Sequence, residues 1–157
     1  MYTSENESFF FLSFLKPHHH VLEYGSGQST NQIAKHVKTL ISIEHQNRWY
    51  QKLNTELENN VTLILAKPDL PYEEGKDCGS YEQFKTYINA PINYGPYDIV
   101  LIDGRARVEC ANICSKFSNS DTFIFIHDFD RKEYQVINEI LLKIKQVETM
   151  ALFKLKS

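Results

Sequence analysis

Apolar residues recur along this chain in short runs separated by segments with helical character. The runs predict five strands, at residues 20–24, 39–44, 61–66, 97–103 and 122–127. The segments between them suit helices at residues 29–37, 47–58, 105–117 and 130–141. Strands that alternate with helices are typical of a mostly parallel sheet covered by helices on both faces.

The two ends of the chain carry further signals. Ser4 and Glu7 match a capping box, so the phenylalanine-rich segment after them predicts a short helix that ends before Pro17. Asp130 and Glu133 match a second capping box, which predicts that the last helix begins there. Residues 142–156 have room for one or two terminal strands.

The strand–helix alternation is interrupted over residues 67–96, which contain four of the five prolines and four tyrosines. Ser80 and Gln83 predict a short helix that continues to about Ile88, with a loop on each side. Long loops often act as lids or binding loops, and a surface insertion packed down by its tyrosines is the alternative. We expect a single domain over residues 1–157, with 67–96 as its variable part.

Composition narrows the class of protein. A chain of 157 residues that is 42% hydrophobic and 24% charged suits one domain with its own core, and argues against disorder. Seventeen basic and twenty acidic side chains provide no general attraction to nucleic acid or to a membrane surface. The apolar run at residues 9–15 is too short to span a bilayer. Three sparse cysteines favour a reducing, cytoplasmic compartment.

Polar residues and glycines follow the predicted strands. Ligands of open α/β sheets bind at the carboxyl ends of the strands, near the switch in strand order. The first strand runs into Gly25-Ser26-Gly27, the second ends at Glu44, the fourth at Asp103, and the fifth at His127 and Asp128. Because parallel strands share one carboxyl edge, we expect these residues to lie along the same edge of the sheet.

The glycine loop and Glu44 indicate an adenosine-type ligand. Gly25 and Gly27 let the backbone approach a ligand closely. Glu44 lies nineteen residues after Gly25, near the ~20-residue offset at which a carboxylate binds a ribose diol. NAD and S-adenosylmethionine both fit. Thr30 stands where a dinucleotide fingerprint has Gly or Ala, and Glu23 lies where a pyrophosphate would sit, so an NAD-linked oxidoreductase is the less favoured alternative.

These motifs resemble those of class I S-adenosylmethionine-dependent methyltransferases. The resemblance rests on Glu-Tyr-Gly-Ser-Gly-Gln-Ser-Thr at residues 23–30, Glu44, Leu-Ile-Asp-Gly at 101–104 and Ile-His-Asp at 126–128. Asp-Gly-Arg-Ala-Arg-Val-Glu-Cys-Ala, at residues 103–111, is similar to a subgroup of small methyltransferase-like proteins with unassigned acceptors. The family resemblance implies a three-layer Rossmann-like α/β fold, whose mostly parallel seven-stranded sheet has an antiparallel C-terminal strand.

The resemblance also implies a cofactor site for S-adenosylmethionine. Gly25 and Gly27 would line the methionine part of the cofactor, Glu44 would hold the ribose hydroxyls and His45 would flank the adenine. The full set of candidate cofactor-binding residues is Glu23, Gly25, Ser26, Gly27, Ser29, Thr30, Glu44 and His45.

The candidate catalytic residues are Asp103, His127 and Asp128. Asp103 is the polar group expected beside the reacting methyl, and Asp128 resembles the carboxylate that metal-dependent O-methyltransferases place after their fifth strand. The two carboxylates would hold Mg²⁺ and acidify an acceptor hydroxyl. Alternatively, His127 acts as a general base. A third interpretation is that the carboxylates cap the following helices.

The predicted function is O-methylation of a small-molecule or glycan-like acceptor, because the fourth strand lacks the Pro-Pro-Tyr motifs of amine and amide methylation. Arg105 and Arg107 would bind an acidic or sugar-like acceptor, or pair with nearby carboxylates. A non-catalytic partner module with the same fold is the alternative, since the short N-terminal segment leaves little to cover an acceptor pocket. A homodimer would supply such a cover. We expect neither a nucleic-acid nor a membrane partner.

Overall fold

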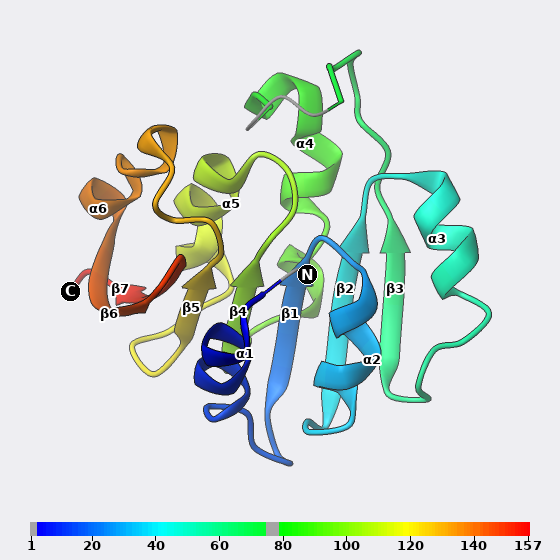
Figure 1. Ribbon diagram of the computed structural model, residues 1–157. Helices are drawn as coiled ribbons and strands as arrows, with labels where there is room; N and C mark the ends of the chain where they lie inside the picture. Colours follow the sequence, from blue (N-terminus) through cyan, green and yellow to red (C-terminus); the bar gives the residue numbers. More distant parts are fainter. Residues whose placement is uncertain (1–2, 75–78) are drawn as a thin grey trace.

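The computed structural model describes residues 3–74 and 79–157, and its strands form a seven-stranded sheet in the order β3-β2-β1-β4-β5-β7-β6 (Figure 1). The strands are β1 (His20–Tyr24), β2 (Thr39–Glu44), β3 (Val61–Leu65), β4 (Ile99–Ile102), β5 (Phe123–Ile126), β6 (Leu141–Val147) and β7 (Met150–Leu155). The helices are α1 (Glu5–Leu12), α2 (Gln28–Ala34), α3 (Asn47–Leu53), α4 (Tyr81–Asn89), α5 (Arg107–Ile113) and α6 (Ile137–Ile140).

Strand direction confirms the predicted fold class. Strands β1 to β5 pair in parallel, whereas β7 is antiparallel to both of its neighbours, β5 and β6. Strand β6 therefore runs in the same direction as β5, and β7 is the reversed strand. The segment predicted to hold one or two terminal strands forms this β6–β7 hairpin.

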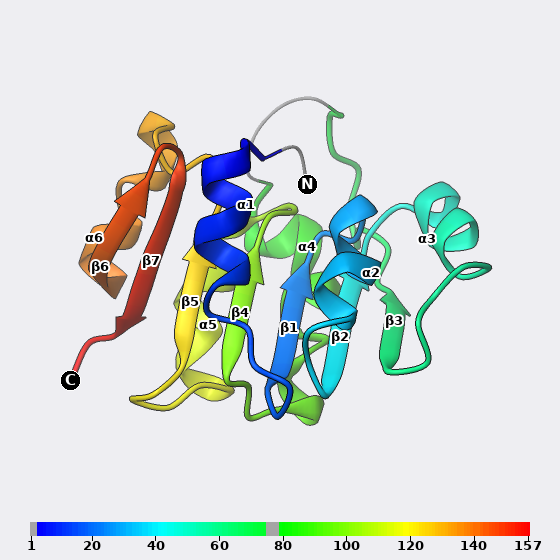
Figure 2. The same ribbon diagram turned by 60° about the horizontal axis from the view of Figure 1, so that its bottom comes forward.

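Helices cover the sheet on both faces. Helices α1 and α2 lie on one face, and α4, α5 and α6 lie on the other (Figure 2). On the first face, Phe10 and Phe11 of α1 pack edge-on against Phe125 of β5, with ring centroids 5.6 and 5.0 Å apart. Burial of such aromatic side chains is a dominant source of packing free energy. No helix in residues 3–74 and 79–157 has the length and apolarity needed to cross a membrane.

Helix α4 gives the proline-rich segment 67–96 a structural role. Ser80 and Gln83 form the predicted capping box, with each side chain bonded to the other residue's backbone N–H. Phe84, Tyr87 and Ile88 of this helix are fully buried against the sheet. Parallel strands need a crossover connection, and α4 provides the one between β3 and β4. Part of the segment therefore belongs to the core.

The predicted capping box at Asp130 and Glu133 is wrong. After β5 the chain makes a turn in which Arg131 N–H donates to the carbonyl of Asp128, and Asp128 adopts a left-handed φ of 56°. A short 3₁₀ turn at Lys132–Tyr134 follows, and α6 begins only at Ile137. The turn uses up the residues that the sequence assigned to the first helical turn. Helices α2 and α3 are also shorter than predicted.

The loop after β1 and the loop after β4 touch at their backbones. Gly25 has a φ of +93°, and a Cβ on it would lie 2.6 Å from the carbonyl oxygen of Asp103. A Cβ on Gly104 would lie 2.0 Å from the hydroxyl of Tyr87 and 3.0 Å from Cα of Gly25. Only glycine at position 25 meets both the left-handed φ and this close approach.

We therefore predict that Gly25→Ala lowers the free energy of unfolding by at least about 1 kcal/mol, because it adds a strained φ and a backbone clash. Urea denaturation followed by circular dichroism measures the change. Gly27→Ala is the matched control, since the φ of Gly27 is an extended 177° that any residue adopts. Equal destabilisation by the two substitutions would contradict the prediction.

Candidate active site

The candidate residues meet at the carboxyl edge of the sheet, as the sequence predicts. Glu23 and the glycine loop lie at the end of β1, Glu44 ends β2, Asp103 follows β4, and His127 and Asp128 follow β5. In Figure 1 this edge is at the tips of the strand arrows. The residues form three groups along the edge: a hydroxyl-rich group around Glu23, the pair Glu44 and His45, and a charged group around His127.

Glu23 is fully buried, and three hydroxyl groups donate to its carboxylate. Ser29 Oγ donates to Oε1 at 2.8 Å, while Thr30 Oγ1 and Ser42 Oγ donate to Oε2 at 2.8 and 2.7 Å. Burial raises the pKa of Glu23, and the three hydroxyl bonds oppose that rise. Glu23 thereby ties the start of α2 to β1 and β2, directly beneath the glycine loop.

The glycine loop is held by the same network. Ser26 Oγ lies 2.6 Å from Ser42 Oγ, and the N–H of Gly27 donates to Thr30 Oγ1 at 3.0 Å. Thr30 and Glu23, the two residues that argued against a dinucleotide, are thus bonded to each other. The side chain of Thr30 fixes the loop by a hydrogen bond, which a glycine at the same position could not do.

Glu44 is buried at the end of β2, beside a cavity of about 520 Å³. Its Oε1 accepts hydrogen bonds from the backbone N–H groups of His45 and Gln46, at 2.9 and 2.8 Å. This bonding fixes the carboxylate and the turn that follows it. The cavity is lined by His45, Gln46, Asn47, Arg48, Trp49, Lys52, Tyr72 and Glu74. The cavity is lined by His45, the predicted adenine contact, whereas the glycine loop is not among its lining residues.

His45 lines this cavity, and nine-tenths of its side chain is buried. Its ring is surrounded edge-on by Tyr72, Phe84 and Tyr87, at centroid distances of 5.7, 5.9 and 5.9 Å. Neither ring nitrogen makes a hydrogen bond to any described residue, although Nδ1 lies 3.2 Å from Oε1 of Glu44. Buried polar atoms without a partner are uncommon, so this imidazole has hydrogen-bonding capacity for a ligand.

The three candidate catalytic residues form one cluster. His127 Nδ1 lies 3.0 Å from Oδ1 of Asp103 and 3.8 Å from Oδ2 of Asp128. Each of the three residues offers a donor atom, and these atoms lie within 4.8 Å of one another. A single metal ion can contact groups at that spacing. The sequence prediction that these residues come together holds geometrically.

Glu7 is a member of the cluster that sequence reasoning placed only in a helix cap. Its Oε2 lies 3.3 Å from Nε2 of His127, and its Oε1 accepts from both the N–H and the hydroxyl of Thr149, at 2.8 and 2.5 Å. It also completes the capping box with Ser4. Helix α1 is therefore fixed to the carboxyl edge of β5 and to the β6–β7 turn. No local sequence signal distinguishes this role of Glu7 from its role in the capping box.

Three neighbouring carboxylates favour the charged form of the His127 imidazole. Burial opposes a charge on the imidazole, but the hydrogen bond to Asp103 and the charges of Asp103, Asp128 and Glu7 together raise the pKa of His127. Burial likewise works against the charge of Glu7, yet its bonds to Thr149 and Ser4 and the charge of His127 lower the pKa of Glu7. Both ring nitrogens of His127 face carboxylate oxygens, so the imidazole is engaged on both sides.

Arg107 lies between the carboxylates of the same cluster. Its Nη1 is 3.2 Å from Oδ2 of Asp128 and 3.5 Å from Oδ1 of Asp103. Of the two roles that the sequence allowed for Arg107, the structure shows the pairing with nearby carboxylates. Arg105 has a different environment, because its guanidinium stacks 5.8 Å from the ring of Tyr72.

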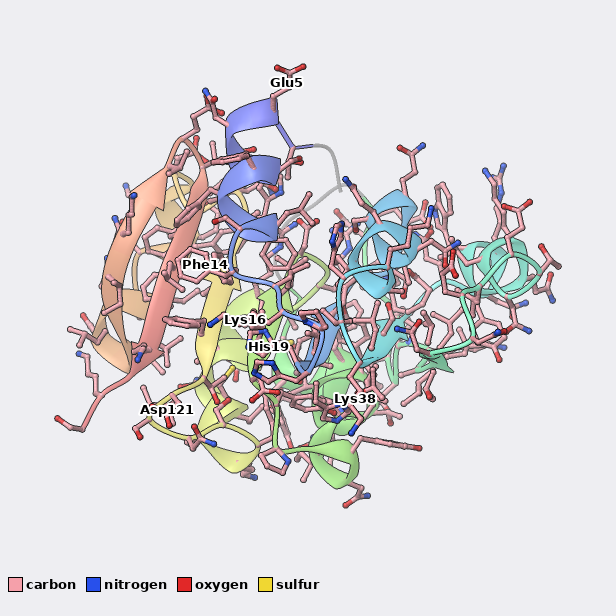
Figure 3. The ribbon with its side chains drawn as sticks, turned by 90° about the horizontal axis from the view of Figure 1, so that it is seen from below. Glu5, Phe14, Lys16, His19, Lys38 and Asp121 are labelled. Carbon is pink, nitrogen blue, oxygen red and sulfur yellow. The ribbon has the colours of Figure 1, made fainter. Side chains whose placement is uncertain are left out.

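The histidines at positions 18–20 lie at the opposite end of the sheet, where β1 begins. Figure 3 shows that end, with His19 beside Lys16. His19 Nδ1 accepts from the N–H of Lys16 at 3.2 Å, and His20 stacks on Tyr97 at 4.9 Å. These contacts are structural. Cys110 and Cys114 are buried free thiols, and burial raises the pKa of both. Cys78 lies outside the described residues.

Comparison with known proteins gives likeness in structure alone. No family model and no curated protein sequence matches the chain. Among solved structures, a methyltransferase-like protein from Silicibacter pomeroyi is 22% identical, with a TM-score of 0.72, and the match covers 99% of this chain and 88% of that one.

Two further structures contain bound ligands. The N-methyltransferase NodS from Bradyrhizobium japonicum, in complex with S-adenosyl-L-homocysteine, is 13% identical with a TM-score of 0.62, over 97% of this chain and 86% of that one. The methyltransferase MycE of mycinamycin biosynthesis, in complex with Mg, S-adenosyl-homocysteine and mycinamycin VI, is 12% identical with a TM-score of 0.59, over 92% and 43%. The chain thus has the Rossmann-like fold of class I methyltransferases.

The raised pKa of His127 predicts a pH-dependent stability. A histidine whose pKa is higher in the folded than in the unfolded state adds to the free energy of unfolding. This contribution is complete below the unfolded-state pKa of about 6.5 and is lost as the pH rises through the folded-state pKa. We expect the free energy of unfolding to fall as the pH increases from about 6 to about 8, and His127→Gln to remove most of that fall. Denaturant titrations across this range measure it. His36→Gln, at an exposed histidine, should keep the wild-type slope; a flat wild-type profile would refute the prediction.

Proposed function

We propose that this protein is an S-adenosylmethionine-dependent methyltransferase that methylates a hydroxyl of a small-molecule or glycan-like acceptor. The observation that carries the proposal is the position of His45, which follows Glu44 directly, lines a cavity at the same sheet edge as the glycine loop and makes no hydrogen bond through its buried ring nitrogens. The likeness in fold to NodS and MycE, whose structures contain S-adenosyl-homocysteine, supports the same assignment.

In the proposed complex the chain binds the cofactor along the carboxyl edge from β4 to β2. Glu44 accepts hydrogen bonds from the ribose hydroxyls through its carboxylate, and the nitrogens of His45 bond to the adenine. The loop at Gly25, Ser26 and Gly27 faces the methionine part, held in place by the hydroxyl network of Glu23. The cofactor supplies an electrophilic methyl group, so orientation of the acceptor provides much of the rate.

The acceptor side of the proposed site is the cluster that contains Asp103 and Asp128. Asp128 is the more accessible of the two, with 27% of its side chain exposed against 8% for Asp103. We propose that Asp128 accepts the proton of the acceptor hydroxyl. His127 is engaged by Asp103 on one side and Glu7 on the other, and we assign it to orienting Asp103 rather than to serving as the base.

Mg²⁺ at Asp103 and Asp128 stays a prediction. The donor spacing suits an ion, and the MycE complex contains Mg. However, the two carboxylate oxygens that face His127 Nδ1 already face the guanidinium of Arg107. The residues as placed are neutralised by cations of the chain, so the proposed mechanism includes no step through a metal.

A non-catalytic partner module is the second candidate. The specific observation in its favour is that Asp103, His127 and Asp128 are bonded to one another and to Glu7 and Arg107. Release of S-adenosyl-homocysteine from S-adenosylmethionine, in the presence of a small-molecule extract, separates the two. Turnover that is lost in Asp128→Asn supports the enzyme. Cofactor binding without turnover on any acceptor fraction supports the module.

Two further features of the proposal concern the cell and the assembly. The buried, reduced Cys110 and Cys114 support a cytoplasmic location. The exposed Leu142 and Ile144 on the edge strand β6 support a homodimer. Light scattering after size exclusion measures the mass of the particle directly, and a single monomer peak at high concentration would rule out the dimer.

The cofactor proposal predicts that S-adenosyl-homocysteine binds the wild-type chain and that Glu44→Ala weakens binding by about ten- to a hundredfold, the loss expected for charged hydrogen bonds to a diol. Isothermal titration calorimetry measures both affinities. Glu44→Gln keeps an acceptor oxygen and should lose less. Glu56→Ala, an exposed glutamate that follows α3, is the matched control and should bind like the wild type. Tighter binding of NADH than of S-adenosyl-homocysteine would overturn the assignment.

A further inference from the structure

Arg107 is held at the centre of the charged cluster by contacts that do not involve the carboxylates. Its Nε donates to the carbonyl oxygen of Gly104 at 3.0 Å, and its Nη1 donates to the carbonyl oxygen of His127 at 2.7 Å. The guanidinium also stacks 5.4 Å from the ring of Tyr134. Only 8% of the residue is exposed. The ends of β4 and β5 therefore fix this cation in position.

From that position Nη1 reaches the two oxygens that a metal would use. Oδ2 of Asp128 is 3.2 Å away and Oδ1 of Asp103 is 3.5 Å away, and the same two oxygens face Nδ1 of His127. A divalent ion such as Mg²⁺ binds carboxylate oxygens at ~2.0–2.1 Å in octahedral geometry. It would have to displace the guanidinium, which is held in place by the two backbone carbonyls.

The charges around the site point the same way. The carboxylates of Asp103 and Asp128 both face the guanidinium of Arg107, and Arg131 adds a second cation 3.4 Å from Oδ2 of Asp128. Two carboxylates paired with two guanidinium groups leave no excess negative charge to attract a dication. Arg131 lies at the rim, with 41% of its side chain exposed, whereas Arg107 lies inside.

We propose that Arg107 is the resident cation of the Asp103–Asp128 pair, occupying the place of a divalent ion, and that removal of its guanidinium converts the cluster into a divalent-cation site. Arg107 is then a positioning residue that holds the two carboxylates close to one another. This inference does not depend on the proposed methyltransferase activity, because it concerns only the cluster's own charges.

Titration with Mn²⁺, read by electron paramagnetic resonance, tests the proposal on the full-length chain. We expect Arg107→Gln to bind Mn²⁺ at least about tenfold more tightly than the wild type, and Mg²⁺ to compete for the same site. Arg131→Gln is the matched control: it removes a cation from the same Asp128 oxygen, but from the rim, and should behave like the wild type. The double substitution Arg107→Gln with Asp128→Asn should lose the gained site.

Thermal unfolding with and without Mn²⁺ extends the test to a variant that folds poorly. Mn²⁺ should raise the melting temperature of Arg107→Gln and leave that of the wild type unchanged. Absence of both gained binding and a thermal shift in Arg107→Gln would overturn the proposal. So would Mn²⁺ binding by the wild type that disappears in Asp103→Asn. Titration of the same proteins with S-adenosyl-homocysteine reports separately on the proposed function.

Discussion

The backbone contact between Gly25 and the Asp103–Gly104 peptide sets the geometry of the whole carboxyl edge. Strand β1 lies between β2 and β4. The chain passes from β1 outward to β2 and β3, and then crosses back to β4 on the opposite side of β1. The crevice of an open α/β sheet lies at this switch in strand order. Here the loops on its two sides touch, and this contact fixes where Asp103 lies relative to the glycine loop.

The edge buries its carboxylates by two different physical means. On the β1–β2 side, Glu23 is stabilised by hydroxyl donors, which satisfy its oxygens without adding charge. On the β4–β5 side, Asp103 and Asp128 are stabilised by charged partners. The edge is therefore divided into a part where hydroxyl groups fix the backbone and a part where charged side chains lie close together. A ligand lying across both would meet hydrogen-bonding groups at one end and an electrostatic field at the other.

Local signals in the sequence were sufficient for most of the fold. Strands β2, β4 and β5 are short, mostly apolar runs that are largely buried, and the capping boxes at Ser4 and Ser80 are both formed. The capping signal at Asp130 failed because the turn after β5, with Asp128 in a left-handed conformation, competes with a helix for the same residues. A short motif cannot report such competition.

The sequence predicts which residues meet at the site, but not which side chains contact one another there. Strand-end placement was enough to bring Asp103, His127 and Asp128 together, because parallel strands share an edge. The contact between His127 and Glu7 could not be predicted in this way. The two residues are 120 positions apart in sequence, and no local pattern indicates which carboxylate contacts the imidazole. Arg107 had two open roles for the same reason. Whether it faces a ligand or a carboxylate depends on the backbone carbonyls of Gly104 and His127 that orient it.

The bond between Glu7 and Thr149 joins positions 142 residues apart, close to the two ends of the chain. Contacts of such long sequence separation carry a high loop-closure entropy and form late. Thr149 lies in the turn between β6 and β7, so Glu7 joins helix α1 to the antiparallel end of the sheet. Because the other oxygen of the same carboxylate faces Nε2 of His127, a change in the β6–β7 turn would reach the charged cluster through Glu7.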